Sequence, residues 1–302
     1  MSKKIILLDG GMGQELIRLS KSKPHPLWST FVMLEEPELV QKVHEDYIKA
    51  GASVITLNTY STTPDRLEEN GMADKFSFLQ KKAIDLAKSA INNCGKEVLI
   101  AGCLPPLVWS YVPEKAPSFQ KCVDLYSKIV EEQERNVDLF ICETMSSLKE
   151  AKAAVTAAKI SKKDIWCAFS LEDNDKRDLR SGEPLLNSVK EMQKIGQDKF
   201  LLNCSFPEAI NKGIETLRKE CKSFGAYANG FTSIEPLKNA SNVSVLEVRN
   251  DLGPEEYAKH ALSWANDGAS MVGGCCEIGP KHIKHLYQSL IENDYQIVNK
   301  LN

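Results

Sequence analysis

Short apolar runs, many of them β-branched, alternate with longer amphipathic stretches along the chain. The apolar runs are 5–10, 54–59, 98–103, 139–144, 164–170, 199–205, 224–230 and 269–276. The amphipathic stretches are 37–51, 75–93, 119–136, 147–159, 183–196, 207–220, 254–268 and 280–293. In the first stretch Leu39, Val40, Val43, Tyr47 and Ile48 share one face, as in a helix that packs on a core. The pattern predicts eight strands and eight helices in alternation.

Strands that are apolar throughout are typical of a parallel sheet covered on both faces. Eight strand–helix units in 302 residues fit an α/β fold of the closed (β/α)8 TIM-barrel type. We expect this barrel to form a single domain over residues 1–302. Prolines 37, 207, 254 and 280 head predicted helices, where the first turn tolerates them. A doubly wound open sheet is the alternative.

Most of the predicted strands end in polar or reactive residues. These ends are Asp9-Gly10, Asn58-Thr59, Glu143-Thr144, Asn203-Cys204, Asn229 and Cys275-Cys276. Active sites of such barrels lie at the carboxyl ends of the strands, so we expect these side chains to converge there. Two long connections, 11–36 and 231–253, leave the same end, and we expect them to be loops that cover or line the site.

Composition narrows the classes of partner and compartment. Hydrophobic residues make up 42% of the chain and charged residues 26%, and the net charge is −3 without a block of like charges. This balance favours neither nucleic acid nor a membrane surface as a partner. The N-terminal apolar run is too short for a signal peptide, and no run approaches the roughly 18 residues of a membrane helix. We therefore expect a cytoplasmic protein whose nine cysteines are reduced.

Three of the nine cysteines, Cys204, Cys275 and Cys276, fall at strand ends. Adjacent side chains of an extended chain point to opposite faces, so we expect Gly273 and Gly274 to let the backbone turn. Catalytic Zn²⁺ uses three protein ligands and keeps a fourth position open. The three thiols therefore predict a metal site, with coincidence or a redox-active vicinal pair as the alternatives.

The other candidates for metal binding are weaker. The remaining cysteines are expected to be small core residues; they are Cys94, Cys103, Cys122, Cys142, Cys167 and Cys221. His282 and His285 are three residues apart on a predicted helix that runs away from the strand ends. We expect these histidines to be packed or solvated.

Several motifs together resemble a known family. They are DGGMGQEL (9–16), PLWST (26–30), VHEDYIKAGASVITLNTY (43–60), ICET (141–144), SGEPL (181–185), NCSFP (203–207), YAN (227–229) and GGCC (273–276). On these motifs the chain resembles the single-domain, zinc-dependent homocysteine S-methyltransferases nearly from end to end. The resemblance implies a barrel enzyme that makes methionine. It also implies a zinc held by Cys204, Cys275 and Cys276, with the sulfur of homocysteine as the fourth ligand.

The resemblance also implies a pocket for the amino-acid part of homocysteine. Glu143 of the ET motif matches the family glutamate that binds the ammonium group. The other matching positions are Asp9, Gly10, Gly11, Asn58, Thr59, Gly274 and, near the metal, Asn203 and Asn229.

The residue types suit methyl transfer to a thiol. A metal-bound thiol is deprotonated, so the nucleophile forms without a histidine base. The donor must carry an activated methyl group on a sulfonium or a quaternary ammonium, and aromatic faces hold such cations. Trp28, Tyr60, Trp109 and Tyr111 are the candidates for this role.

The chain departs from the family pattern at 60–63, at 102–111 and at Glu277, where we expect the donor to bind. S-methylmethionine is the expected donor and S-adenosylmethionine the next. One alternative is a related enzyme with another thiol or selenol acceptor or an unusual donor. The other is a zinc-thiolate binding protein without methyl transfer.

Overall fold

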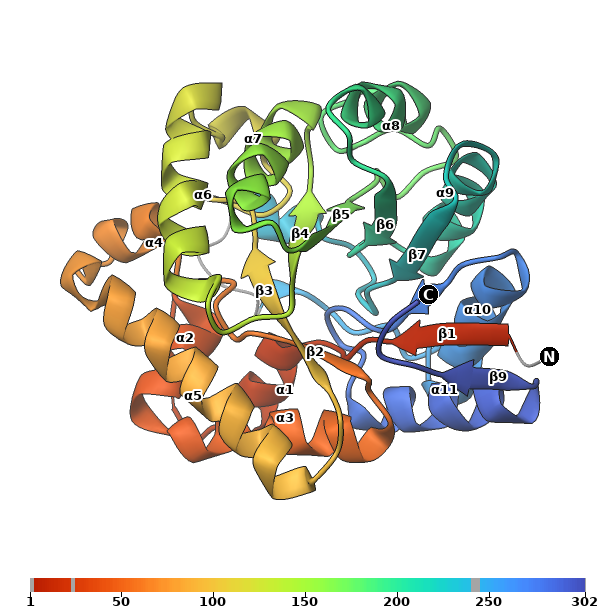
Figure 1. Cartoon of the computed structure of the whole chain (residues 1–302), viewed down its shortest axis with the longest axis horizontal. Helices are drawn as coiled ribbons and strands as arrows, with labels where there is room; N and C mark the ends of the chain where they lie inside the picture. The colour runs from red at the N-terminus through yellow and green to blue at the C-terminus, as the bar shows by residue number, and fades with distance from the viewer. Residues whose placement is uncertain (1–2, 23–24, 240–244, 302) are drawn as a thin grey trace.

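The central feature of the fold is one parallel sheet (Figure 1). The structure is a computed structural model that describes residues 3–22, 25–239 and 245–301. The sheet order is β2-β3-β4-β5-β6-β7-β8-β1-β9. The strands are β1 (Lys3–Leu7), β2 (Val54–Thr56), β3 (Leu99–Leu104), β4 (Leu139–Met145), β5 (Asp164–Phe169), β6 (Lys199–Asn203), β7 (Ser223–Tyr227), β8 (Met271–Val272) and β9 (Tyr295–Ile297).

The sheet closes into a barrel between β1 and β2. A parallel bridge joins Leu8 to Val54. Two backbone hydrogen bonds flank it, from Ser53 N to Leu7 O (2.8 Å) and from Asp9 N to Val54 O (3.1 Å). Strands β1 to β8 therefore form a ring, while β9 pairs with β1 outside it. The closure confirms the predicted TIM barrel and excludes the open sheet.

Helices follow the strands and surround the ring (Figure 1). The eight predicted helices are present as α3 (Pro37–Ala50), α5 (Phe76–Cys94), α6 (Phe119–Gln133), α7 (Leu148–Ala158), α8 (Leu185–Lys194), α9 (Pro207–Glu220), α10 (Pro254–Asn266) and α11 (Pro280–Glu292). Short 3-10 turns add η1 (Ala73–Lys75), η2 (Pro113–Lys115), η3 (Lys159–Ser161) and η4 (Glu235–Asn239). None of the helices in the described ranges combines the length and the apolar character that a membrane span requires.

The prediction that 11–36 is a loop was wrong. This connection contains α1 (Met12–Leu19) and α2 (Trp28–Glu35), and a third short helix, α4 (Pro64–Glu69), follows β2. Helix α2 buries Ser29 and Thr30 as well as Val32 and Met33, so its sequence lacks the apolar period that marks a helix. In the other long connection, 231–253, the described residues include η4, and residues 240–244 lie outside the described ranges.

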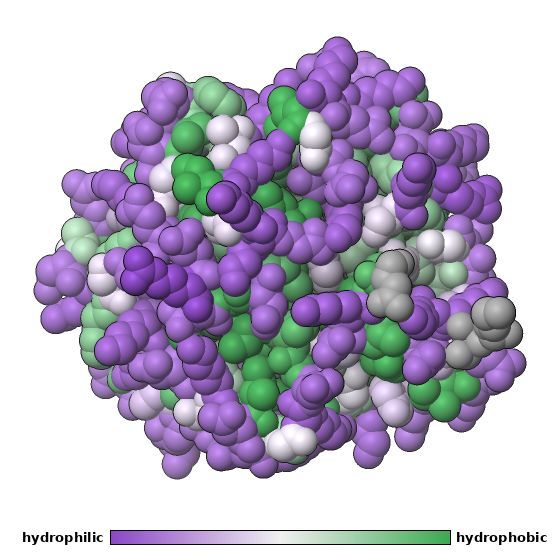
Figure 2. Space-filling model, in the orientation of Figure 1, coloured by the Kyte–Doolittle hydropathy of each residue, from purple (hydrophilic) through white to green (hydrophobic). Residues whose placement is uncertain are grey.

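Two apolar layers explain why the strands are apolar throughout. Ile5 and Leu7 of β1 belong to the layer between sheet and helices, whereas Ile6 and the next residue, Leu8, belong to the layer inside the barrel. The inner layer also contains Trp166, which lines a cavity at the strand starts together with the C-terminal Leu301. Figure 2 shows this end of the barrel as a hydrophilic rim around a hollow with hydrophobic residues. The opposite end, at the carboxyl termini of the strands, carries the candidate site.

Candidate metal and substrate site

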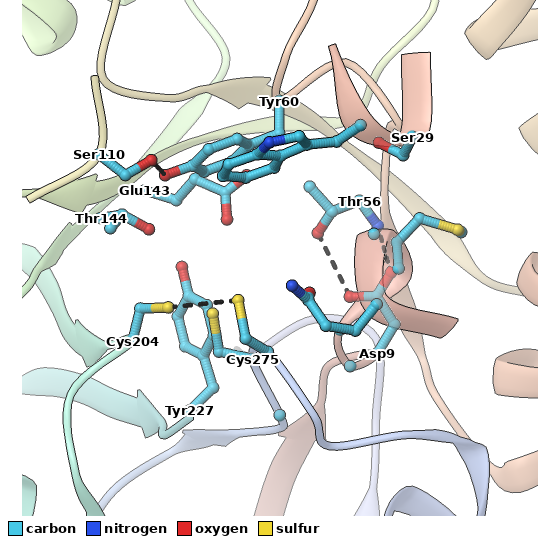
Figure 3. Close-up of a pocket in the computed structure, with 18 of the residues that line it drawn as sticks. Asp9, Ser29, Thr56, Tyr60, Ser110, Glu143, Thr144, Cys204, Tyr227 and Cys275 are labelled. Carbon is cyan, nitrogen blue, oxygen red and sulfur yellow. Dashed lines mark hydrogen bonds between the residues drawn. The ribbon is translucent and has the colours of Figure 1, made fainter. Parts of the chain in front are cut away.

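A pocket at the carboxyl ends of the strands contains most of the residues that the sequence singled out (Figure 3). This main pocket and its open mouth together enclose about 800 Å³ of space that no protein atom occupies. Its lining includes Asp9, Gly10, Gly11, Asn58, Glu143, Gly274 and the three cysteines Cys204, Cys275 and Cys276. The convergence follows from the barrel, because every strand of a closed parallel sheet ends at the same rim.

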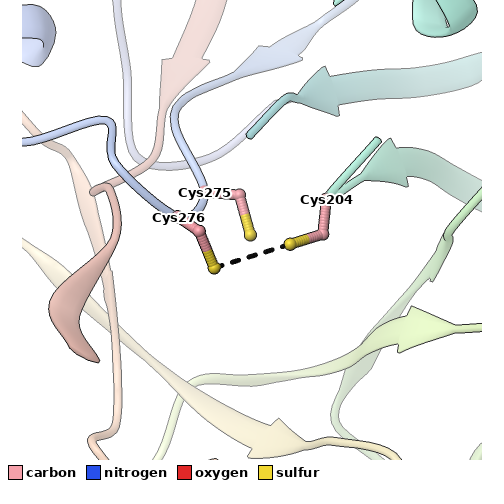
Figure 4. Close-up of side chains that lie close together, drawn as sticks. All are labelled: Cys204, Cys275 and Cys276. Atoms are coloured by element: carbon pink, nitrogen blue, oxygen red, sulfur yellow. Dashed lines mark hydrogen bonds between the residues drawn. The ribbon is translucent and has the colours of Figure 1, made fainter. Parts of the chain in front are cut away.

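The sulfur atoms of Cys204, Cys275 and Cys276 form a tight cluster (Figure 4). All three lie within 4.8 Å of one another, and Cys204 Sγ is 3.6 Å from Cys276 Sγ. Tetrahedral zinc with sulfur ligands at about 2.3 Å would hold two sulfurs about 3.8 Å apart. The cluster therefore fits a zinc ion in both donor type and spacing. It is the only such group of metal-ligating side chains within the described residues.

Strained turns direct these sulfur atoms toward one point. Cys204, directly after β6, has a φ of 48°, and Glu277, directly after Cys276, has a φ of 66°. Ile278 N donates a hydrogen bond to Cys275 O (3.1 Å), which closes a turn over the two cysteines. Left-handed backbone costs a non-glycine residue about 1 kcal/mol or more and is concentrated at functional sites. The turn thus begins at Cys275 and includes both cysteines.

The expectation that Gly273 and Gly274 make the turn was wrong. Neither glycine has a left-handed φ. They are needed for space: a Cβ on Gly273 would lie 2.5 Å from Leu8 Cβ, and one on Gly274 would clash with the side chain of Ile278. The GG pair therefore lets the end of β8 lie directly against its neighbours.

The two glycines after Asp9 serve the same close approach. A Cβ on Gly10 would clash with the carbonyl oxygen of Ile278, and a Cβ on Gly11 would lie 2.6 Å from Cys275 O. Gly11 N also donates to Ile278 O (3.0 Å). The DGG and GGCC motifs thus pack against each other, and the first supports the turn that carries two of the sulfur atoms.

Two buried carboxylates face the main pocket. Asp9 accepts a hydrogen bond from Thr56 N (2.8 Å), and Glu143 accepts one from Cys103 Sγ (2.8 Å). Burial raises the pKa of Asp9 to about 8 and that of Glu143 to about 7. No lysine, arginine or histidine is among the described lining residues. Two carboxyl groups and three thiols without a cationic side chain favour cationic ligands in this pocket.

Cys204 is supported by Tyr111, which the sequence analysis had assigned to the methyl donor, and by Arg180, which the sequence analysis missed. Tyr111 Oη lies 2.8 Å from Cys204 Sγ, and the guanidinium of Arg180 lies 4.8 Å from the centre of the Tyr111 ring. Arg180 also donates to Cys204 O (3.2 Å). Burial acts to raise the pKa of Cys204, but hydrogen bonds from Cys275, Cys276 and Tyr111 outweigh it and hold this pKa well below its usual value. In the sequence, Arg180 could have been identified from its position directly before the SGEPL motif (181–185).

Three predicted site residues do not line the main pocket. Thr59 Oγ1 accepts a hydrogen bond from Gln133 (3.2 Å) behind it. Asn203 binds Thr144 twice, through its Oδ1 to Thr144 N (3.0 Å) and through its Nδ2 to Thr144 Oγ1 (2.9 Å). Thr144 has a φ of 58°, so Asn203 stabilises the turn next to Glu143. The side chain of Asn229 accepts from Phe231 N (3.1 Å).

Aromatic side chains form the wall opposite the sulfur cluster (Figure 3). Trp28 and Tyr60 stack with ring centres 6.0 Å apart, and Tyr60 Oη bonds Ser110 Oγ (2.8 Å). Tyr227, which the sequence analysis missed as a lining residue, directs a hydroxyl group without a hydrogen-bond partner in the described residues into the pocket. In the sequence, Tyr227 could have been identified from its place in the YAN motif (227–229). Trp109 lines a neighbouring cavity instead.

The remaining candidates lie elsewhere. Glu277 lines a shallow groove beside His282, outside the main pocket. His282 Nδ1 accepts from Gly279 N (3.3 Å) at the start of α11, which agrees with its expected packing role. The other six cysteines are outside the main pocket; Cys103, Cys122, Cys142 and Cys167 are buried, and Cys94 and Cys221 are partly exposed.

Known proteins resemble the chain over nearly its whole length. The family model described as homocysteine S-methyltransferase matches residues 6–290. Homocysteine S-methyltransferase YbgG of Bacillus subtilis is 26% identical, with 93% of each chain covered. Homocysteine S-methyltransferase 2 of Zea mays is also 26% identical, over 94% of this chain and 89% of its own. The metallated form of the homocysteine methyltransferase MmuM from Escherichia coli superimposes with a TM-score of 0.79 at 25% identity, over 95% of this chain and 96% of its own.

Proposed function

The chain belongs to the homocysteine S-methyltransferase family, and we propose that its main pocket transfers a methyl group from a sulfonium donor to homocysteine, giving methionine. One observation supports this most strongly. Three thiols and two carboxylates converge in a pocket whose described lining contains no cationic side chain. A metal ion, the ammonium group of homocysteine and a sulfonium are the cations that such a pocket would attract.

Cys204, Cys275 and Cys276 would hold a zinc ion. Soft thiolate ligands favour zinc over hard cations such as magnesium or calcium. When bound, zinc supplies a substrate sulfur that is deprotonated at neutral pH. Tyr111 Oη lies 2.8 Å from Cys204 Sγ and would donate a hydrogen bond to the metal-bound thiolate, while the Arg180 guanidinium packs against the Tyr111 ring. The supporting residues thus stabilise negative charge on the ligand set.

Homocysteine would bind with its ammonium group at Glu143 and Asp9. A buried carboxylate without a cation is unfavourable, and the substrate ammonium would relieve this cost for both side chains. Met12, Gly13 and Gln14 at the start of α1 also line the main pocket. The first turn of a helix favours an anion, so it suits the carboxylate of the same substrate.

Methyl transfer then needs an aligned donor and no protein base. The homocysteine sulfur attacks the methyl carbon, a new S–C bond forms, and the bond from the methyl carbon to the sulfonium sulfur breaks. Its electron pair stays on the departing sulfur, which leaves as a neutral thioether. Trp28 and Tyr60 would hold the sulfonium by their ring faces. We propose S-methylmethionine as donor, with S-adenosylmethionine next.

The free thiols support a reducing, cytoplasmic location as a further part of this proposal. The carboxylates of Asp9 and Glu143 argue against a protein that only binds zinc, because zinc storage does not require a pocket for an amino acid.

The test is zinc content and methyl transfer in protein purified under reducing conditions. We expect stoichiometric zinc, and methionine formation from homocysteine and S-methylmethionine. Cys204→Ser and Cys276→Ser should lose both while the barrel stays folded by circular dichroism. Cys221→Ser, outside the main pocket, is the matched control and should retain both. Full turnover by metal-free protein would contradict the three-thiolate assignment.

A further inference from the structure

A second cavity adjoins the main pocket on its outer side. This outer cavity is lined by Trp28, Arg66, Glu69, Asn70, Val108, Trp109, Ser110 and Leu237. Trp28, Ser110 and Leu237 line both cavities. The two cavities therefore adjoin along these three residues.

Arg66 of α4 is a buried cation in the wall of the outer cavity. Arg66 is only 7% exposed to solvent. One terminal nitrogen donates to Pro106 O (3.0 Å), whereas its buried Nε has no hydrogen-bond partner in the described residues. None of the ion pairs among the described residues includes Arg66: the adjacent Asp65 pairs with Lys121 (3.5 Å), and the carboxylate of Glu150 accepts from Leu107 N (2.9 Å). A buried charge without a paired partner is unfavourable, so the position suits an anionic ligand.

The guanidinium of Arg66 lies against the aromatic pair that walls the main pocket. Its central carbon is 5.3 Å from the centre of the Tyr60 ring and 5.9 Å from that of Trp28. The same two rings are the proposed support for the sulfonium. An anion bound to Arg66 would thus lie next to the same two rings that would support the sulfonium.

The outer cavity also contains a negatively charged side chain, that of Glu69. Glu69, three residues after Arg66 on α4, is exposed and has no ion-pair partner in the described ranges. Asn70 Nδ2 donates to Arg66 O (2.8 Å) and adds an amide side chain beside them. A cationic and an anionic side chain in one small cavity match the carboxylate and ammonium groups of an α-amino acid.

We propose that the outer cavity binds the amino-acid end of the methyl donor, with Arg66 binding the carboxylate and Glu69 the ammonium group. The proposal rests on the proposed function and specifies its donor class. The donor is a sulfonium α-amino acid, and a simple sulfonium without that group is a poor substitute.

The test measures binding to the zinc-loaded protein by calorimetry without homocysteine, so that no turnover occurs. The two probes are S-methylmethionine and its decarboxylated analogue, (3-aminopropyl)dimethylsulfonium. We expect the unaltered protein to bind S-methylmethionine at least tenfold more tightly, because charge-assisted hydrogen bonds to arginine are strong. Arg66→Met should remove this preference. Glu69→Gln should weaken both probes several-fold, and Glu68→Gln, exposed on the same helix but outside the cavity, should change neither.

The proposal is overturned if the unaltered protein does not distinguish the probes, or if Arg66→Met weakens both equally, as a merely structural arginine would. Arg66→Lys serves if the methionine variant does not fold: it keeps the charge without the forked donor group and should retain only part of the preference. A homocysteine methylation assay separates the two proposals. Methyl transfer without carboxylate preference contradicts the donor site alone. Preference without methyl transfer contradicts the proposed function alone.

Discussion

At the scale of single residues, Cys204 differs from the other cysteines in the charge-stabilising groups around its sulfur. Tyr111 Oη contacts it at 2.8 Å, whereas burial raises the pKa values of Cys142 and Cys167. A thiol becomes a good metal ligand only when its thiolate form is stabilised. The environment therefore separates Cys204 from the core cysteines more sharply than its position in the sequence does.

The hydroxyl of Tyr111 should strengthen metal binding. We expect Tyr111→Phe to lower zinc affinity by about 10- to 100-fold, the usual loss when a group that supports a metal ligand is removed. Competition with a chromogenic chelator measures this affinity. The control is Tyr227→Phe, whose hydroxyl bonds none of the cysteines. Equal affinities in Tyr111→Phe and the unaltered protein would remove the hydroxyl from this role.

Glu143 should act on homocysteine and not on zinc. We expect Glu143→Ala to weaken homocysteine binding by about 100-fold, the size of a lost hydrogen bond between charged groups, with zinc content unchanged. Calorimetric titration of the zinc-loaded protein with homocysteine checks the first part and elemental analysis the second. Unchanged homocysteine affinity would exclude Glu143 from the substrate site.

At the scale of elements, the ends of β1 and β8 depend on each other. Gly10 and Gly11 leave room for the backbone of Cys275 and Ile278, and Gly273 leaves room for Leu8. The two ends come from opposite termini of the chain, and they meet because the ring places β1 next to β8. Glycine is used here for close approach, while non-glycine residues such as Cys204 and Glu277 adopt the left-handed backbone.

Because of this packing, we expect alanine to be harmful at Gly10 and tolerated at Gly253. Gly10→Ala would press a Cβ into the carbonyl oxygen of Ile278, so we expect it to displace the turn and lose zinc. Gly253→Ala, at the start of α10, meets no atom within 4 Å and should keep both zinc and the thermal midpoint. Zinc analysis and thermal melts compare the two. Normal zinc binding by Gly10→Ala would show that the motif serves another purpose.

At the scale of the whole molecule, the barrel buries ionisable groups that affect its stability. His44 on α3 is fully buried, and neither of its ring nitrogens has a hydrogen-bond partner in the described residues. Burial lowers the pKa of His44 from 6.5 to about 4. Its neutral form is therefore the one that the folded protein accepts.

The lowered pKa of His44 makes the folded protein less stable in acid. The unfolded chain binds a proton at His44 below pH 6.5 and the folded protein only near pH 4, so stability is lost as the pH falls through this window. We expect His44 to contribute a loss of about 3 kcal/mol in the free energy of unfolding by pH 4, from about 1.4 kcal/mol per pKa unit. Urea unfolding at several pH values measures it. His44→Gln should flatten the slope, whereas His285→Gln should not.

The comparison with His44→Gln isolates this histidine from Asp9 and Glu143. Their raised pKa values give a contribution of opposite sign, which is lost progressively as the pH rises from the ordinary values of 3.8 and 4.5 to about 8 for Asp9 and about 7 for Glu143. A slope in His44→Gln as steep as in the unaltered protein would assign the acid sensitivity to other groups.

The sequence by itself determined the fold and singled out the three cysteines whose sulfur atoms the structure brings together. The eight apolar runs and eight amphipathic stretches correspond to strands and helices whose bounds differ from the prediction by a few residues. This succeeds because burial on two faces and the helical period leave a direct trace in the order of residues. Short helices such as α2 leave no such trace, because they contact the protein on several sides.

Only the tertiary structure decided what surrounds each candidate residue. It places Thr59 behind the main pocket, makes Asn203 a support for Thr144, and brings Arg180 to Tyr111. It also makes Gly273 and Gly274 spacers beside their neighbours. The physical reason is that a side chain's role depends on contacts across different strands and loops. Those contacts exist only after the ring closes and places distant segments at one rim.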